Sequence, residues 1–211
     1  MPFWHNIKCF EFSVLPSRIR VDKGTETGIM CTMQMFLTDG DETSVLYGPS
    51  TQNKIERWWR ELSHRLERFF KNQLKRLVEN GDYDSTNKIH RLLLAYIYIP
   101  VLQKELDVFR ISVWNNHRVR RQKEKDLPCG IPEHIFNFPE RYGGENCGKH
   151  LTEEMLCEVA ELSKVLEVSD YLSEPIRLEC ERHLPNPGDL KPYDADSAYL
   201  YLKLHFDESR V

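Results

Sequence analysis

The stretch Ser50-Thr51-Gln52-Asn53-Lys54-Ile55-Glu56-Arg57-Trp58-Trp59-Arg60-Glu61 opens a long amphipathic pattern. Ser50 or Thr51 supplies the polar side chain that caps the first turn of a helix. The pattern predicts a helix that ends near Asn80-Gly81 and buries both tryptophans in a core. Its apolar residues follow the i, i+3, i+4, i+7 spacing of one helix face: Ile55, Trp58, Trp59, Leu62, Leu66, Phe69, Phe70, Leu74 and Leu77.

Glu56 lies beside this apolar stripe, with Asn53 one helical turn before it and Arg60 one turn after it. Two interpretations stay open, a carboxylate in a surface salt bridge and a ligand of a metal site. Asp22 favours the second, because it ends the strand-like run Arg18-Ile19-Arg20-Val21-Asp22 just before a turn at Gly24. Open α/β sheets place their ligands at the C-terminal ends of strands. Asp22 and Glu56 are therefore candidates for one site.

The composition is that of a soluble globular protein, with 211 residues of which 40% are hydrophobic and 29% are charged. The longest apolar run, residues 92–102, is shorter than the roughly 20 residues of a membrane-spanning helix, and the N-terminus has no signal-peptide pattern. The six cysteines form no C-x-x-C pair, which indicates free thiols in a reducing compartment and gives no zinc-site spacing. We therefore expect an intracellular protein, nuclear or cytoplasmic, without membrane contact.

Charge is distributed unevenly along the chain. Residues 54–125 hold 17 Lys/Arg against 9 Asp/Glu, whereas residues 126–211 hold 8 against 18. Within the basic part, cations recur along the polar face of the long helix at Arg57, Arg68, Lys71 and Lys75, and a basic run spans residues 118–125. Both patterns are typical of a solvated face and also of a surface that binds phosphate backbones.

Hydrophobic periodicity and turn residues predict further elements. The C-terminal stretch 198–206 fits both a strand and a helix. The remaining predictions are a helix over residues 26–37, an extended piece at 45–47, a helix from Asp84 or Ser85 with a kink or break at Pro100, a helical piece ending at 115–117, a linker at 126–148, a helix capped by Thr152 and a helix at 173–184.

Residues 18–26 and 50–60, supported by Leu106-Asp107-Val108-Phe109-Arg110 and Trp114-Asn115-Asn116-His117-Arg118, resemble the integrase core domain. This is the retroviral and transposon DDE family, whose fold is ribonuclease H-like. The resemblance covers residues 16–142, and 33 residues lie between Asp22 and Glu56. It implies that these two carboxylates are two of three that hold Mg²⁺ or Mn²⁺ ions for DNA strand transfer. The DNA-binding candidates are Asn53, Lys54, Arg57, Arg60, Arg68, Lys71, Lys75, Arg118, Arg120 and Arg121.

The chain departs from the family pattern at the first catalytic Asp. That residue belongs on the first strand of the sheet, and Glu11 is the sole acidic residue before Asp22. Lys23 also places a cation beside Asp22, which competes with a bound metal ion. We therefore expect the divalent ion to be weakly held or absent and the core to be catalytically inactive.

These observations together predict a helix-rich α/β protein. An irregular segment, residues 1–15, precedes a partial ribonuclease H-like core at 16–142 that lacks its first strands, and an acidic, mostly helical region follows at 143–211. The expected function is sequence-indifferent DNA binding by a protein derived from a transposon or retroelement. An active DDE integrase, complete with further N-terminal sequence, and a protein-interaction scaffold are the alternatives, and homo-oligomerisation is left open.

Overall fold

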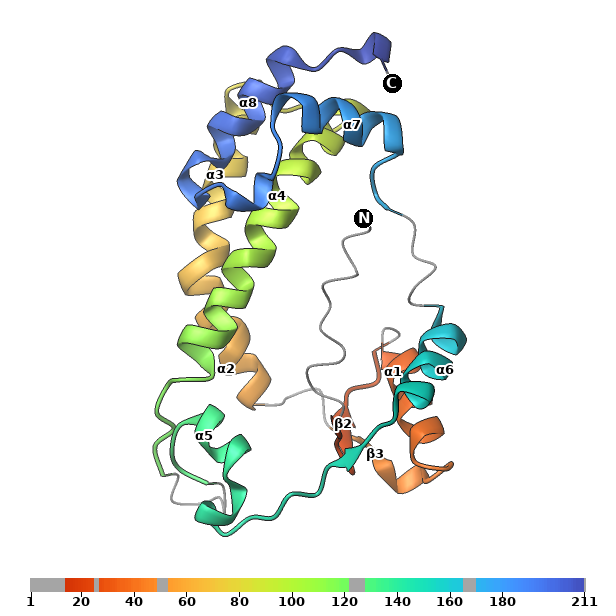
Figure 1. Cartoon of the computed structure of the whole chain (residues 1–211). Helices are drawn as coiled ribbons and strands as arrows, with labels where there is room; N and C mark the ends of the chain where they lie inside the picture. Colours follow the sequence, from red (N-terminus) through yellow and green to blue (C-terminus); the bar gives the residue numbers. More distant parts are fainter. Residues whose placement is uncertain (1–13, 25–26, 49–52, 122–127, 165–169, 211) are drawn as a thin grey trace. The chain divides into compact units, whose positions relative to one another are not determined.

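The chain is helix-rich, and its described part contains two sheets of two strands each. The computed structural model describes residues 14–24, 27–48, 53–121, 128–164 and 170–210 (Figure 1). Contacts divide the chain into two units, Met1–Glu56 with Phe138–Asp170 and Arg57–Asn137 with Tyr171–Val211. Each unit thus combines two distant parts of the sequence. The predicted boundary between residues 142 and 143, which separates family-like from other sequence, stays a prediction.

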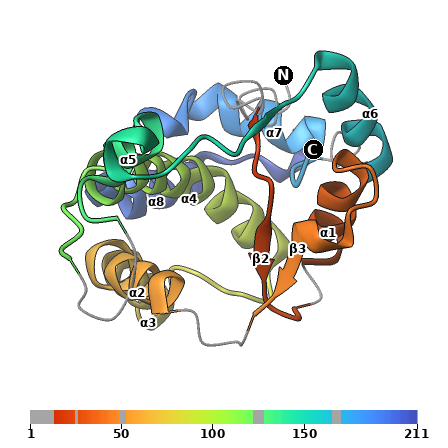
Figure 2. The same cartoon turned by 90° about the horizontal axis from the view of Figure 1, so that it is seen from below.

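The first unit contains a short β-α-β arrangement. Strand β2 (Ile19–Val21) pairs in parallel with β3 (Val45–Tyr47), with Ile19 opposite Val45, and helix α1 (Thr27–Leu37) connects the two strands (Figure 1, Figure 2). The predicted strand, helix and extended piece are confirmed. A small core of Val21, Cys31 and Val45 holds the arrangement together. This α/β connection is the part of the fold that places Asp22 at a strand end.

Helix α1 buries only some of its apolar side chains. Ile29 is 63% exposed and Phe36 is 44% exposed. Cys31 packs against the two strands, and Leu37 packs against Leu15 and Val159. Gln34 is also buried and is satisfied in this position, since its Nε2 donates to the Pro16 carbonyl at 2.8 Å.

The first unit also contains a pair of strands that lie far apart in the sequence. Strand β1 (Val14–Leu15) pairs antiparallel with β4 (Lys149–His150). Helix α6 (Glu153–Ser163) follows, and the hydroxyl of Thr152 accepts a hydrogen bond from the Met155 amide at 3.3 Å. The predicted Thr152 cap is therefore confirmed.

The long helix of the second unit contains a π-helical turn. It comprises α2 (Asn53–Leu62), the π-helical turn Ser63–Glu67 and α3 (Arg68–Glu79). The extra residue of such a turn shifts everything after it around the helix axis, so Phe70 is buried at 3% exposure while Phe69 is 41% exposed. The predicted burial of Phe69 is wrong for this reason, and that of Trp59, which is 58% exposed, is also wrong.

This helix ends at the predicted glycine. Gly81 adopts a left-handed backbone with φ of 75°, and its amide donates to the Val78 carbonyl at 3.0 Å, so the predicted end is confirmed. The predicted caps Ser50 and Thr51 lie outside the described residues.

Helix α4 (Lys88–Val108) runs through Pro100 and continues as a π-helical stretch, Phe109–Trp114. Of the two alternatives predicted at Pro100, a kink or a break, the break is therefore wrong. Proline removes one backbone donor, and the loss is tolerated because the flanking turns pack in the core through Ile97 and Val101. The start is also later than predicted, because the Asn87 side chain, which accepts from the Ile89 and His90 amides, caps the helix.

The C-terminal part of the chain completes the core of the second unit. Helices α7 (Glu174–His183) and α8 (Ala195–His205) pack with α3 and α4 (Figure 1), and α8 decides between the two predictions for residues 198–206 in favour of a helix. The Tyr96 hydroxyl donates to the Leu184 carbonyl at 2.7 Å, and Gln73 Nε2 donates to the Pro192 carbonyl at 2.9 Å. The buried residues are Phe70, Leu77, Leu93, Tyr96, Ile97, Tyr98, Val101, Leu172, Ile176, Cys180, Ala195, Ala198, Tyr199 and Leu202.

The segment predicted as a linker, residues 126–148, contains two short helical pieces. They are α5 (Pro132–Asn137) and a 3-10 turn, Pro139–Tyr142, closed by Gly143 at φ of 72°.

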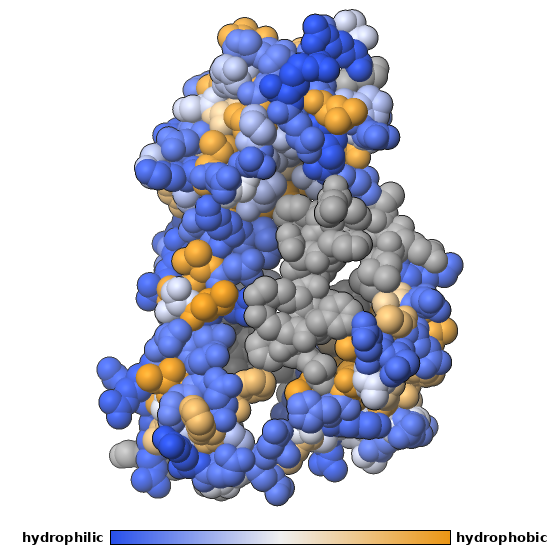
Figure 3. All heavy atoms as spheres, in the orientation of Figure 1, coloured by the Kyte–Doolittle hydropathy of each residue, from blue (hydrophilic) through white to orange (hydrophobic). Residues whose placement is uncertain are grey.

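Figure 3 shows hydrophilic residues over most of the visible α3 and α4 surface, with hydrophobic ones in small separate groups.

Candidate functional site

Asp22 is exposed directly after β2, at the strand end where it was predicted. Its Oδ1 accepts a hydrogen bond from the Gly24 amide at 3.2 Å, which closes the turn that leads into α1. One carboxylate oxygen of Asp22 is therefore engaged in a hydrogen bond of the turn. Lys23, which follows Asp22 in the chain, is also exposed. The role of Asp22 as a metal ligand stays a prediction.

Glu56 is exposed on the first turns of α2. Within the described residues, no group of three or more His, Cys, Asp and Glu side chains is arranged to hold a metal ion. The hard oxygen ligands that Mg²⁺ and Mn²⁺ require are thus not gathered in this part of the chain. The described residues do not fit a two-ion site, and no catalytic step follows from them.

The cations of α3 are partly neutralised by neighbouring acids. Lys71 Nζ forms an ion pair with Glu67, and Lys75 Nζ lies 3.4 Å from Glu79 Oε1. The hydrogen bond from Lys71 is the main cause that holds the pKa of Glu67 below its usual value. The role of these cations in DNA binding stays a prediction, and Arg68 is exposed without an ion pair in the described part of the chain.

The arginines at the start of α2 differ from the lysines of α3 in their ion pairs within the part of the chain that the structure describes. Arg57 and Arg60 are exposed and form no ion pair with the described residues. Asn53 and Lys54 belong to the first turn of α2, but their side chains lie outside what the structure describes.

An aromatic cluster brings the start of α2 to the end of the α4 helix. The Trp58 ring lies edge-on to Phe109, with centroids 5.8 Å apart, and to Trp114 at 6.5 Å. Trp114 in turn contacts the His117 ring at 4.8 Å. Phe109 is buried, and Trp58 and Trp114 are half-buried. The contact joins two stretches that lie far apart in the sequence.

The second stretch, which follows His117, is held in place by backbone pairing. Val119 and Gly130 exchange two hydrogen bonds of 2.8 and 3.1 Å. The Glu133 amide donates to the Asn115 carbonyl at 3.0 Å. Arg118, Arg120 and Arg121 are exposed on this stretch and form no ion pair with the described residues.

We call the following set the Trp58 surface, since Trp58 joins its two parts: Arg57, Trp59 and Arg60 from α2, and Arg118, Arg120 and Arg121 from the stretch after α4. Arginine presents a planar fork of donors that matches phosphate oxygens. Sequence reasoning identified the five arginines, but it missed their spatial relation. The signal was the pair of tryptophans, Trp58 and Trp114, each within four residues of a basic stretch.

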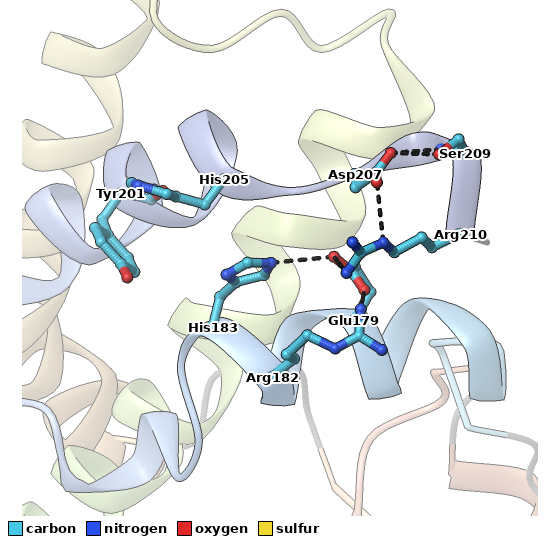
Figure 4. A network of polar contacts seen from close by, with 8 residues as sticks. All are labelled: Glu179, Arg182, His183, Tyr201, His205, Asp207, Ser209 and Arg210. Atoms are coloured by element: carbon cyan, nitrogen blue, oxygen red, sulfur yellow. Dashed lines mark hydrogen bonds and ion pairs between the residues drawn. The ribbon is translucent and has the colours of Figure 1, made fainter.

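A second polar cluster, missed entirely by sequence reasoning, surrounds Glu179 on α7 (Figure 4). Glu179 is 1% exposed; Arg182 donates to it, His183 Nε2 lies 3.0 Å from its Oε1, and Arg210 Nη1 lies 3.9 Å away. Arg210 Nε also contacts Asp207 at 3.0 Å. The spacing of Glu179, Arg182 and His183, one helical turn apart, was the available signal.

The charge balance of this cluster explains how it tolerates burial. Burial alone raises the pKa of Glu179, but the hydrogen bond from His183 and the charges of Arg182 and Arg210 outweigh it and hold that pKa below its usual value. A carboxylate so surrounded ties the C-terminal segment to α7 and is a structural element.

Comparison with known families gives one result. A family model described as the integrase core domain matches residues 3–136. The matched span contains Asp22, Glu56 and the whole Trp58 surface. Comparisons with curated proteins and with solved structures gave no match. Within the described residues, no helix is both long enough and apolar enough to cross a membrane.

Proposed function

Because the chain belongs to the integrase core domain family, we propose that it binds DNA and that the Trp58 surface makes the contact. The family implies a ribonuclease H-like fold, and its members generally bind DNA and use divalent metal ions. We also propose that the chain derives from a transposon or retroelement, as the resemblance implies.

The observation that carries this proposal is the contact between Trp58 and Trp114, whose ring centroids lie 6.5 Å apart, because it joins the two chain segments that carry the arginines. Five exposed arginines without ion pairs in the described chain lie on these stretches. Arginines of this kind bind phosphates strongly, because no acidic partner has to be displaced first. Lys71 and Lys75, which have acidic partners, are expected to contribute less.

The test is fluorescence anisotropy with labelled duplex DNA of several unrelated sequences over a range of salt concentrations. Binding to phosphates releases counterions, so affinity falls with salt with a logarithmic slope of about 0.9 per neutralised phosphate. The variant carrying Arg57→Gln and Arg60→Gln is expected to lower that slope by about 2. The variant carrying Lys71→Gln and Lys75→Gln removes the same charge and is the matched control, with a smaller change expected.

Two results count against the proposal. Absence of duplex binding at low salt removes binding of duplex DNA as a function. Equal losses in the two double variants leave general electrostatic attraction and remove the assignment to the Trp58 surface.

Catalytic inactivity remains a prediction. It is supported by the turn that engages the Asp22 carboxylate and by the neighbouring Lys23. The chain is expected to show no strand transfer in Mg²⁺ or Mn²⁺. Nicking or joining of DNA that disappears on Glu56→Gln would contradict this expectation and favour an active DDE enzyme.

A further inference from the structure

We infer that Trp59 is a stacking platform for an unpaired base, so that the Trp58 surface prefers single-stranded DNA to intact duplex. This inference rests on the proposed function, because it names the form of DNA that the same surface would bind. It assigns Trp59, which the sequence pattern predicted to be buried, to the binding surface.

Trp59 is unusually exposed for a tryptophan. Its side chain is 58% exposed, whereas Trp58 and Trp114, the other tryptophans in the described part of the chain, are half-buried. A large aromatic ring in water leaves unused the apolar area that it would bury on binding a ligand. A π-face of this kind accepts any base, since every base has a π-face of its own.

The Trp59 ring is supported by neighbouring aromatic rings. The centroids of Trp59 and Trp58 are 4.7 Å apart and their planes meet at 84°. The Trp58 ring in turn makes edge-on contacts with Phe109 and Trp114. The support restricts Trp59 before a ligand arrives, which reduces the entropy lost on stacking.

Positive charge lies on both chain segments that meet at the aromatic cluster. Arg57 and Arg60 are exposed on the same helix as Trp59, and Arg118, Arg120 and Arg121 are exposed on the stretch after His117. Glu56 is also exposed and lies one helical turn before both Trp59 and Arg60, so its carboxylate repels a phosphate. An uncharged base over the ring, with its phosphates directed to the arginines after His117, satisfies both conditions.

Tryptophan and arginine are also frequent at the centres of protein–protein interfaces. The charge of the chain favours a polyanion, because residues 54–125 hold 17 Lys/Arg against 9 Asp/Glu. The five arginines of the surface also form no ion pair with the described residues. DNA is therefore the occupant that we propose, and a protein partner would appear as a negative result in the test below.

The experiment compares a labelled single strand of poly-dT with a labelled hairpin duplex of the same number of nucleotides, using the full chain. Trp59→Ala is expected to weaken binding of the single strand about 5- to 150-fold, the range found for loss of one base–aromatic stack, and to weaken duplex binding by a clearly smaller factor. Trp59→Phe retains an aromatic face and is expected to recover part of the loss. Binding of the single strand is also expected to quench tryptophan fluorescence, less so in Trp59→Phe.

Phe69→Ala is the matched control, because Phe69 is an exposed aromatic residue on the same long helix, at 41% exposure. It is expected to change neither affinity. Equal thermal unfolding of all three variants and the unmodified chain shows that the fold is retained, as the exposure of both side chains predicts.

The outcomes separate the inference from the proposed function. If the chain binds duplex but Trp59→Ala leaves single-strand binding unchanged, or weakens both forms equally, the inference is overturned and the proposed function stands. If neither form of DNA binds at low salt, both the proposed function and the inference fail.

Discussion

Truncation of Leu202 to alanine tests whether the C-terminal helices share one core with α3 and α4. Leu202 lies on α8 with 0% exposure, whereas Leu204 on the same helix is 80% exposed. The substitution removes three buried carbons, worth about 0.8 kcal/mol each, which gives about 2.4 kcal/mol. The cavity left behind raises the expected loss of unfolding free energy to about 2–5 kcal/mol. Leu204→Ala is the matched control, with a change within about 0.5 kcal/mol.

The assay is urea unfolding followed by circular dichroism, combined with hydrogen exchange of the backbone amides. In a shared core, Leu202→Ala lowers the protection of α3 and α4 amides as much as that of α8 amides, since all of them open in the same unfolding event. A loss of protection confined to α8, or a destabilisation as small as that of Leu204→Ala, would show that the C-terminal region is a separate module.

Three further predictions concern the same core and its surroundings. Tyr96→Phe loses the hydrogen bond to the Leu184 carbonyl at the end of α7 and is expected to lower the free energy of unfolding by about 1 kcal/mol. Tyr98→Phe is expected to leave that free energy unchanged or to raise it in urea unfolding, because the buried Tyr98 hydroxyl has no hydrogen-bond partner among the described residues. The lowered pKa of Glu179 means that its stabilising effect is present above the ordinary carboxyl value of 4.5 and is lost as pH falls below it; urea midpoints from pH 7 to pH 3 are expected to fall less in Glu179→Gln than in the unmodified chain. Burial raises the pKa of the Cys180 thiol to about 12, so iodoacetamide at pH 8 is expected to modify the exposed Cys157 in the folded chain and to spare Cys180, as mass spectrometry of peptides would show.

Local sequence signals predicted the elements that local chemistry determines. The strand at residues 19–21, the helix that follows it and the end of the long helix at Gly81 depend on β-branched residues, helical spacing and a left-handed turn. The Thr152 cap depends on one hydroxyl and one amide. Each of these features lies within a few residues of the chain and needs no distant partner.

Packing decided the elements that the sequence left ambiguous. Between residues 198 and 206, the alternation of leucines obscured a helical stripe that includes alanines. The structure buries Ala195, Ala198, Tyr199 and Leu202, which has the i, i+3, i+4, i+7 spacing of a helix face. The weak apolar character of alanine hid this stripe, and contact with α4 selects it.

The π-helical turn and Pro100 illustrate rules that hold locally and fail in context. The extra residue within Ser63–Glu67 changes which side of α3 is buried, yet no residue type marks such a turn in the sequence. Proline stops isolated helices, but α4 continues through Pro100 because the core covers the helix on both sides of it. The family resemblance did not reveal the Trp58 surface either, since that surface depends on a contact between residues 58 and 114.

The length of α4 separates the proposed binding surface from the core that determines stability. Its 21 residues span about 30 Å at 1.5 Å per residue; Phe109, just beyond the C-terminal end, contacts Trp58, whereas Leu93 near the start lies in the core with α8. Substitutions at such distances without shared contacts have additive effects. Changes to Arg57, Trp59 or Arg60 should therefore alter binding without altering the unfolding of the helical core. The loss of affinity in such variants then measures the surface itself, which makes the DNA-binding proposal testable independently of stability.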